Sequence, residues 1–201
     1  MTVLVLPDMF TVLRDPVNSM AMPYSDVPLA ITVGLHVFHC VSQYASLTVV
    51  DWAHHLISNM LVAGLCFPFV YGPLSNWGVF FVCGFPGGVD YYLLAFVKLG
   101  WLKSAQEKSA NRFLNMWIRA PGICCWVALA YACWASGRTS MPDAVLAAQA
   151  FLNMCNAIYF ADRVVANEAV TRWCAENGVD KKGAEQRRRE QGGAGGRKKA
   201  S

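Results

Sequence analysis

The fold class follows from one uncharged stretch, residues 52–89, which reads WAHHLISNMLVAGLCFPFVYGPLSNWGVFFVCGFPGGV and contains no Asp, Glu, Lys or Arg. A second uncharged stretch runs from Val27 to Val50. A helix needs about 20 apolar residues to cross the ~30 Å hydrocarbon core of a bilayer. Both stretches are apolar enough for this, and together they are too long for a single crossing. The sequence therefore predicts an all-α, multi-pass transmembrane helix bundle.

The composition of the whole chain agrees with a membrane location. Of its 201 residues, 55% are hydrophobic and 15% are charged, whereas soluble proteins carry about 25% charged residues. Most of the chain is therefore not expected to face water. This excludes a disordered protein and a nucleic-acid-binding protein, so we expect membrane lipids and no nucleic acid as partners. A homo-oligomer or other membrane proteins are further partners that the composition allows.

Prolines, glycines and isolated charges divide the apolar sequence into about five predicted spans. The boundary between the first two spans falls near Asp51. The predicted spans are residues 27–46, 52–71, 77–99, 113–134 and 143 to about 160 or 165. The transmembrane bundle is thus expected to occupy residues 27–166.

The charges orient this bundle. Residues 172–201 carry nine basic and four acidic side chains, a net charge of +5, and the remaining 171 residues sum to −1. Because short cytoplasmic segments are enriched in Lys and Arg, we expect residues 167–201 to form a basic, largely disordered cytoplasmic tail, on the same side as the loop at 100–111. Residues 1–26 lack the basic start of a secretory signal, and we interpret them as a non-cytoplasmic or interfacial segment.

All four histidines lie within a short part of the chain. His54 and His55 follow Asp51 by three and four residues, so on a helix either imidazole can lie over the carboxylate. A carboxylate that orients an imidazole is the usual arrangement of a general base. We therefore predict Asp51, His54 and His55 as catalytic residues and His39 as a substrate-binding residue. The alternative is a structural role at the membrane interface.

A metal site is a weaker prediction. A mononuclear site using His39, His54 or His55 with Asp51 or Asp90 is chemically reasonable, but the four histidines are too few for a membrane di-iron oxygenase. We therefore predict neither a metal nor a cofactor. The eight cysteines include no C-x-x-C pair, and we expect them to be free thiols.

Asp90 lies inside the third predicted span, directly after a segment rich in glycine and proline, residues 84–88. Irregular backbone within a membrane is tolerated only where protein or a water-filled cavity covers it. Ionisable residues within spans are functional candidates by default, because they are expensive to bury there. We therefore predict that Asp90 faces the bundle interior, either as a catalytic residue or as the partner of a histidine or Arg119.

The order of these residues resembles a known family. A His-His pair opens one span, an Asp follows 35 residues later in the next span, a Lys comes about two turns beyond it, and an Arg-bearing span follows. This pattern resembles the TLC superfamily, which contains ceramide synthases and translocating-chain-associated membrane proteins. The residues that carry the resemblance are Tyr44, Asp51, His54, His55, Asp90, Leu94, Lys98, Asn111, Phe113 and Arg119.

The resemblance implies a TLC-like fold and an enzyme of lipid metabolism. In ceramide synthases, the His pair and downstream aspartates transfer an acyl group from coenzyme A to a lipid amine, so acyl-CoA would be the co-substrate. By position, Tyr44, Lys98 and Arg119 become substrate-binding candidates. Where the synthases have a further His beside an Asp, this chain has residues 84–88. This departure favours an alternative, a non-catalytic protein that binds lipid or a partner and affects membrane composition or protein biogenesis.

A third hypothesis is a small transporter or channel, because an interrupted helix with an acid near the membrane centre is typical of transporters. The chain contains no inverted repeat to support it. At the C-terminus, Lys198 and Lys199 stand four and three places from the end and resemble a dilysine retrieval signal. We therefore expect an endoplasmic reticulum membrane protein with its C-terminus in the cytoplasm.

Overall fold

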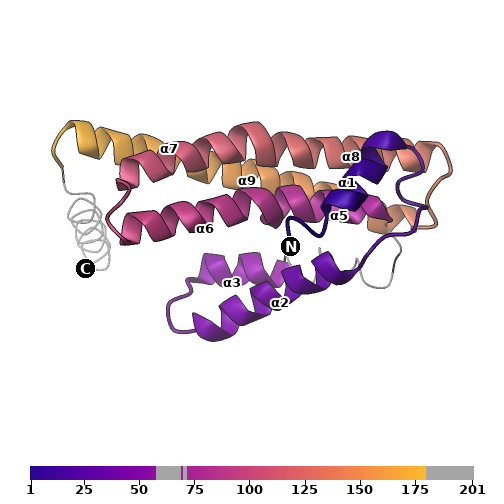
Figure 1. Cartoon of the computed structure of the whole chain (residues 1–201), viewed down its shortest axis with the longest axis horizontal. Helices are drawn as coiled ribbons and strands as arrows, with labels where there is room; N and C mark the ends of the chain where they lie inside the picture. The colour runs from indigo at the N-terminus through magenta and orange to yellow at the C-terminus, as the bar shows by residue number, and fades with distance from the viewer. Residues whose placement is uncertain (58–68, 70–71, 180–201) are drawn as a thin grey trace, which may run out of the picture.

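The computed structural model describes residues 1–57, 69 and 72–179, and these residues form helices and connecting turns without any strand. The prediction of an all-α protein is confirmed. Figure 1 shows the arrangement of the helices. The elements are α1 Leu6–Arg14, α2 Val27–Ser42, α3 Val49–Leu56, α5 Pro73–Val79, the π-helical segment η2 Phe80–Gly84, α6 Phe85–Lys98, α7 Ser104–Leu114, the π-helical segment η3 Asn115–Arg119, α8 Ala120–Ala135 and α9 Asp143–Glu176.

Three continuous helices are long and apolar enough to cross a membrane. The first combines α5, η2 and α6, the second combines α7, η3 and α8, and the third is α9. They contain 26, 32 and 34 residues, and at 1.5 Å per residue each is about 39–51 Å long, more than a ~30 Å hydrocarbon core requires. These helices correspond to the third, fourth and fifth predicted spans. The second and third continue further into the charged end of the bundle than predicted.

The first two predicted spans look different. The first corresponds to α2, which is apolar but has only 16 residues. The second begins with α3, and most of its remaining length lies outside the described residues. The described part of the chain thus holds three candidate spans and a shorter helical hairpin, α2–α3.

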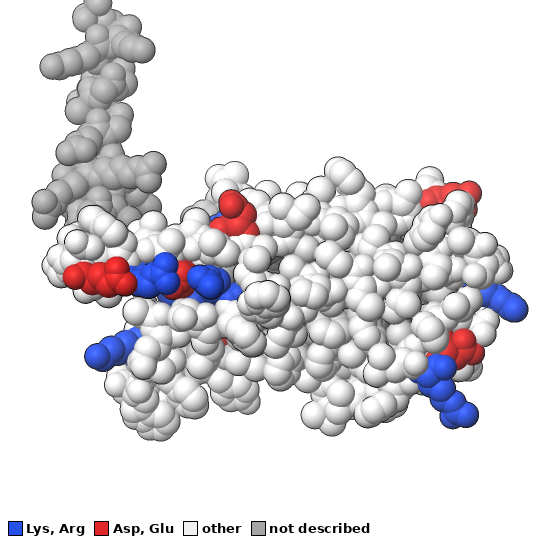
Figure 2. All heavy atoms as spheres, turned by 90° about the horizontal axis from the view of Figure 1, so that it is seen from above, with Lys and Arg blue, Asp and Glu red and all other residues white. Residues whose placement is uncertain are grey.

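The three long helices lie side by side, α1 lies across one end of them, and the α2–α3 hairpin lies along one flank (Figure 1). In Figure 2, Lys, Arg, Asp and Glu gather mainly towards the two ends of the bundle and leave a wide uncharged surface between them. The loop after α6 and the end of α9 lie at the same end (Figure 1). An apolar belt between charged ends is the surface that a membrane-spanning bundle requires.

Close packing holds the long helices together. The indole N–H of Trp77 donates to the carbonyl of Gly122, 3.1 Å away on the neighbouring helix. A Cβ atom added to Gly122 would lie 2.1 Å from the ring of Phe81, so only glycine fits at this crossing. Trp126, buried nearby on α8, extends the same core. Small residues at such crossings are the usual means by which membrane helices approach each other.

Two of the long helices widen locally into π-helix just before a proline. η2 ends before Pro86, and η3 ends before Pro121. Proline lacks the N–H of a regular helical turn and its ring collides with an earlier carbonyl, so the wider turn accommodates it. The sequence predicts irregular backbone at residues 84–88, but the helix continues regularly through Gly87 and Gly88 as part of α6. The irregular turn lies just before them, in η2. The two π segments contact each other across the helix pair, and such segments are frequent at functional sites.

Smaller features complete the fold. Asp8 of α1 is buried and accepts a hydrogen bond from the side chain of Asn76 on α5, which fixes the N-terminal segment to the core. All the cysteines that the structure describes are free, as predicted.

Candidate functional site

The four histidines lie together where α2 faces α3, and we call His36, His39, His54 and His55 the histidine cluster. The ring centroids of His36 and His55 are 5.5 Å apart, and those of His39 and His55 are 4.9 Å apart. The ring of His54 lies 5.3 Å from that of His55 and 6.3 Å from that of His36. The hairpin therefore brings two pairs from separate helices into one site.

The histidine cluster also touches the long helices. The ring of His54 packs edge-on against Phe160 of α9, with the centroids 4.8 Å apart. The charge of Arg119, at the end of η3, acts on the same imidazole. The cluster thus lies in the seam between the α2–α3 hairpin and the three-helix core.

Two imidazoles of the cluster have informative hydrogen-bonding states. Nδ1 of His36 lies 2.8 Å from the carbonyl oxygen of Thr32. Since a carbonyl only accepts, Nδ1 carries the hydrogen and Nε2 keeps its lone pair. Nδ1 of His55 is buried and has no hydrogen-bond partner within the described residues. The cluster therefore offers at least one ring nitrogen that is a defined acceptor and one that lacks a partner.

Asp51 is engaged by the start of α3. Its Oδ2 accepts from the backbone N–H of Thr48 at 3.0 Å and from the Thr48 hydroxyl at 2.7 Å, and that hydroxyl oxygen accepts from the Asp51 N–H at 3.2 Å. This is a capping box. The bonds from Thr48 hold the pKa of Asp51 below its ordinary value. Asp51 still acts on His54 and His55 through its charge, but the bonds described here go to the helix start.

Arg119 connects the histidine cluster to Asp90. Its Nη1 donates to Oδ1 of Asn115 at 2.7 Å, whereas its Nε is buried without a partner in the described part of the chain. Its guanidinium interacts electrostatically with both Asp90 and His54. A Cβ atom on Gly87, one turn before Asp90, would lie 3.8 Å from Nη2 of Arg119. Arg119 therefore lies directly beside α6 at Gly87.

Asp90 is half-buried on α6, which packs against α7. The charged groups that act on it are Glu107, Lys108 and Arg119. Among the described residues, its buried Oδ1 has no hydrogen-bond partner, and the carboxylate forms no ion pair within 4.0 Å. Asp90 thus lies within electrostatic range of Arg119, one of the partners that the sequence predicts for it, without a direct ion pair.

Two other predicted site residues lie apart from this seam. Tyr44 is 72% exposed at the turn of the hairpin, where its ring packs against Trp52 with the centroids 5.7 Å apart. Lys98 is exposed at the end of α6. In the part of the chain that the structure describes, neither contacts the histidine cluster.

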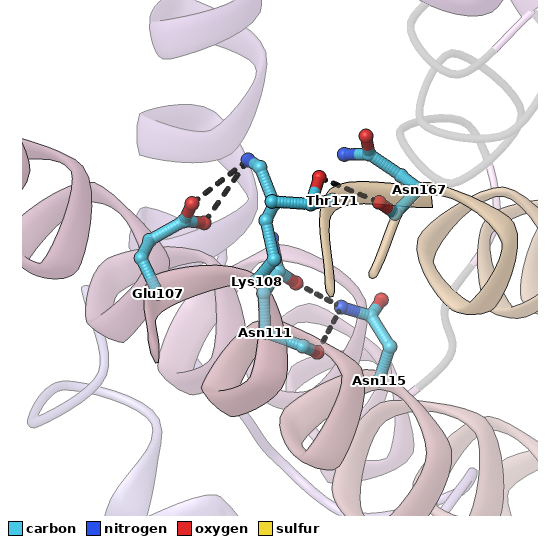
Figure 3. A network of polar contacts seen from close by, with 6 residues as sticks. All are labelled: Glu107, Lys108, Asn111, Asn115, Asn167 and Thr171. Atoms are coloured by element: carbon cyan, nitrogen blue, oxygen red, sulfur yellow. Dashed lines mark hydrogen bonds and ion pairs between the residues drawn. The ribbon is translucent and has the colours of Figure 1, made fainter. Parts of the chain in front are cut away.

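Sequence reasoning missed a network of polar side chains between α7 and α9, shown in Figure 3. Glu107 is only 1% exposed and pairs with Lys108 at 2.9 Å. About two turns further on, at the start of η3, the side chain of Asn115 donates to the carbonyl of Asn111 at 2.9 Å, and its Oδ1 accepts from Arg119. This network therefore leads from the charged end of the bundle to the candidate site.

A second buried carboxylate belongs to the same end of the bundle. Glu168 of α9 is 4% exposed and lies 3.6 Å from Arg112 of α7 and 3.5 Å from Arg172, one turn along α9. The four-residue spacing of Glu168 and Arg172 is the one sequence signal that indicates part of this network. The contact with Arg112 ties α7 to α9.

An apolar groove of about 360 Å³ lies between η3–α8 and α9. The predicted site residues are absent from its walls, so it is separate from the polar seam. Its lining residues are Met116, Ala120, Cys124, Met154, Ala157, Ile158, Ala161, Asp162 and Val165.

Comparison with known proteins found no family model, no curated protein and no solved structure that matches this chain.

Proposed function

We propose that this chain is an integral membrane protein of lipid metabolism that binds the polar part of a lipid in the seam between the α2–α3 hairpin and the core. The observation that carries the proposal is a set of buried polar atoms there that have no hydrogen-bond partner among the described residues: Nδ1 of His55, Nε of Arg119 and Oδ1 of Asp90. Buried polar groups are nearly always hydrogen-bonded in proteins, and leaving one unpaired costs about 1–3 kcal/mol. A polar ligand between them would remove this cost.

The surroundings of the seam favour a lipid over a water-soluble ligand. The hairpin exposes large apolar side chains beside its histidines, including Leu35, Phe38 and Leu56. A ligand with an apolar part could rest against these side chains. The charged residues of the described chain gather mainly towards the ends of the bundle (Figure 2), and a lipid carries its own polar group into the apolar belt between them.

The reaction that these groups fit best is acyl transfer from an acyl thioester, such as acyl-CoA, to a lipid amine. The imidazole of His54 or His55 takes a proton as the amine nitrogen attacks the thioester carbonyl, and returns it to the leaving thiolate when the C–S bond breaks. Arg119, with an unpaired N–H, stabilises the negative charge that develops on the carbonyl oxygen. Asp90 balances the charge of Arg119 and so keeps it in position.

The test is untargeted lipid mass spectrometry on membranes that express wild type or variants at equal protein levels. We expect a product with wild type that falls by about 100-fold or more in His54→Ala/His55→Ala, because general-base catalysis contributes about 10²–10⁴-fold. Arg119→Lys keeps the positive charge but loses the planar guanidinium with its several N–H donors, and should also reduce the amount of product. Arg138→Ala, at the opposite end of the bundle, is the matched control and should leave the product unchanged. Wild-type membranes identical to empty ones would remove the catalytic proposal.

A non-catalytic lipid- or partner-binding protein is the second candidate. It is favoured by the position of Asp51, because the Oδ2 that could orient an imidazole accepts from Thr48 instead. In this case the His54→Ala/His55→Ala protein would retain its biological role. Co-purification of the same lipid with wild type and with this variant would support binding without catalysis.

The cellular location that we propose is the endoplasmic reticulum membrane, with the C-terminus in the cytoplasm. Lys198 and Lys199 support it, because a dilysine signal works only on a cytoplasmic tail. Replacing both by Ser should move the protein to later compartments in a microscopy assay. An unchanged location would show that these two lysines are not the retrieval signal.

A further inference from the structure

We propose that His36, His54 and His55 together bind one transition-metal ion, for which zinc is the best fit. One ring nitrogen from each of these three residues lies within 4.8 Å of the other two. Zinc binds imidazole nitrogen at about 2.0–2.1 Å in tetrahedral geometry, which places the nitrogens about 3.3 Å apart. Small side-chain rotations close the difference, because the ligands come from two facing helices of one hairpin.

The hydrogen bond of His36 prepares this residue as a ligand. Its Nδ1 donates to the carbonyl of Thr32 at 2.8 Å, which leaves the lone pair on Nε2. Histidines that ligate metals almost always donate their other ring N–H to a carbonyl or carboxylate, which fixes the tautomer and the ring orientation. His36 already shows this arrangement, and its carbonyl partner lies one turn earlier on the same helix.

The buried nitrogen of His55 is a second, independent observation. Its Nδ1 has no partner in the described residues, and the rings on either side of it are imidazoles: His36 at 5.5 Å, His39 at 4.9 Å and His54 at 5.3 Å between centroids. A bound cation removes this difficulty, because it uses the lone pair of a ring nitrogen.

The ligand set indicates which metal fits. Three neutral nitrogens without a thiolate suit zinc in an open site, in which the fourth position holds water or a substrate atom. The charges around the site are mixed: Asp51 acts on His54 and His55, and Arg119 acts on His54. Arg119 opposes a bare cation but favours an anionic fourth ligand, such as hydroxide or the oxygen of a carboxylate or phosphate. We therefore expect the metal to bind together with such an anion.

This inference concerns the same seam as the proposed function, but it does not depend on lipid chemistry. If zinc is bound, the lone pairs of His54 and His55 are used as ligands. The proton acceptor of the acyl-transfer proposal would then be a zinc-bound hydroxide, since zinc lowers the pKa of its bound water to near 7. Metal binding and lipid turnover are measured separately, so the failure of one is distinguishable from the failure of the other.

The experiment is a metal titration of the full chain, purified in detergent and freed of metal with a chelator. We expect one Zn²⁺ per chain by elemental analysis, and Co²⁺ in its place should give the intense visible absorption of a tetrahedral site. His36→Ala, His54→Ala and His55→Ala should each weaken binding by about 100-fold or more, because loss of even a residue behind the ligands costs about 10–100-fold. Gln variants at the same positions, which keep more of the side-chain volume, guard against misfolding.

His39→Ala is the matched control. His39 belongs to the histidine cluster but not to the group of three whose ring nitrogens lie within 4.8 Å of one another, so this variant should bind zinc within a few-fold of wild type. The proposal is overturned if folded wild type takes up no stoichiometric Zn²⁺ or Co²⁺. Equal loss in His39→Ala and in the other three variants would overturn the assignment of these three ligands.

Discussion

The three-helix core and the α2–α3 hairpin differ in how they use their glycines and polar residues. In the core, Gly122 lets two helices approach until the ring of Phe81 fills the space of a side chain. In the hairpin, no described atom lies within 4 Å of the place where a Cβ of Gly34 would be. At these two positions the core is closely packed and the hairpin, which carries the histidine cluster, is open.

The candidate site lies at the boundary between the three-helix core and the hairpin, and each region supplies part of it. The core supplies Arg119 from the end of η3 and Asp90 from within α6. The hairpin supplies the imidazoles, and His54 touches the core through Phe160. The candidate site is therefore built from both regions.

The largest effect is expected from Gly122→Ala. The new Cβ would lie 2.1 Å from the ring of Phe81, and overpacking of this kind costs about 1–3 kcal/mol. Thermal unfolding in detergent, followed by circular dichroism, should show a clear decrease in the midpoint temperature.

A compensating change sharpens this test. Phe81→Ala in the same chain makes room for the new methyl group, so the double variant should lose less than the two single changes together. If Gly122→Ala unfolds at the wild-type temperature, the close contact between η2 and α8 is wrong.

Much of the core could be predicted from the sequence. Uncharged runs of sufficient length, ended by prolines and charges, indicated three of the spans, and the length of a bilayer crossing is a strong constraint. Their ends were less predictable: α9 continues to Glu176, because Glu168 pairs with Arg112 on a neighbouring helix. Contacts between distant parts of the chain leave no local signal.

The candidate site was predictable in its residue types rather than in its geometry. The sequence grouped the histidines and singled out Asp90 and Arg119. It paired Asp51 with an imidazole, since the spacing allows this, but the same carboxylate is also three residues from Thr48 and caps α3. The proximity of His36 to His55 depends on how the hairpin folds back, and spacing along one helix says nothing about it.

A smaller effect is expected from Asp51→Ala, which removes the capping box of α3. Loss of a helix cap costs about 1 kcal/mol, and the hairpin should show it locally as faster amide hydrogen exchange in α3 relative to α9. Since the folded-state pKa of Asp51 is lowered by its bonds from Thr48, its contribution is complete above the ordinary pKa of an aspartate, about 3.9. It is lost as the pH falls below that value towards the folded pKa.

Asp51→Asn distinguishes the cap from the charge. Asparagine keeps an oxygen that can accept from Thr48 but does not titrate, so α3 should stay protected and its protection relative to α9 should no longer change below about pH 4. The same exchange rate in wild type and in Asp51→Ala would show that the start of α3 is held by other contacts.

The smallest effect is expected from Gly34→Ala, the same substitution as in the core but placed in the hairpin. A methyl group at Gly34 meets no described atom within 4 Å, and alanine is favoured over glycine inside a helix by up to about 1 kcal/mol. The variant should therefore keep or slightly raise the protection of α2 against hydrogen exchange, with an unchanged thermal midpoint of the core. A loss of stability comparable to that of Gly122→Ala would mean that α2 packs tightly against something on this face. The hairpin would then be as closely built as the core, and the openness that we assign to it at Gly34 would be wrong.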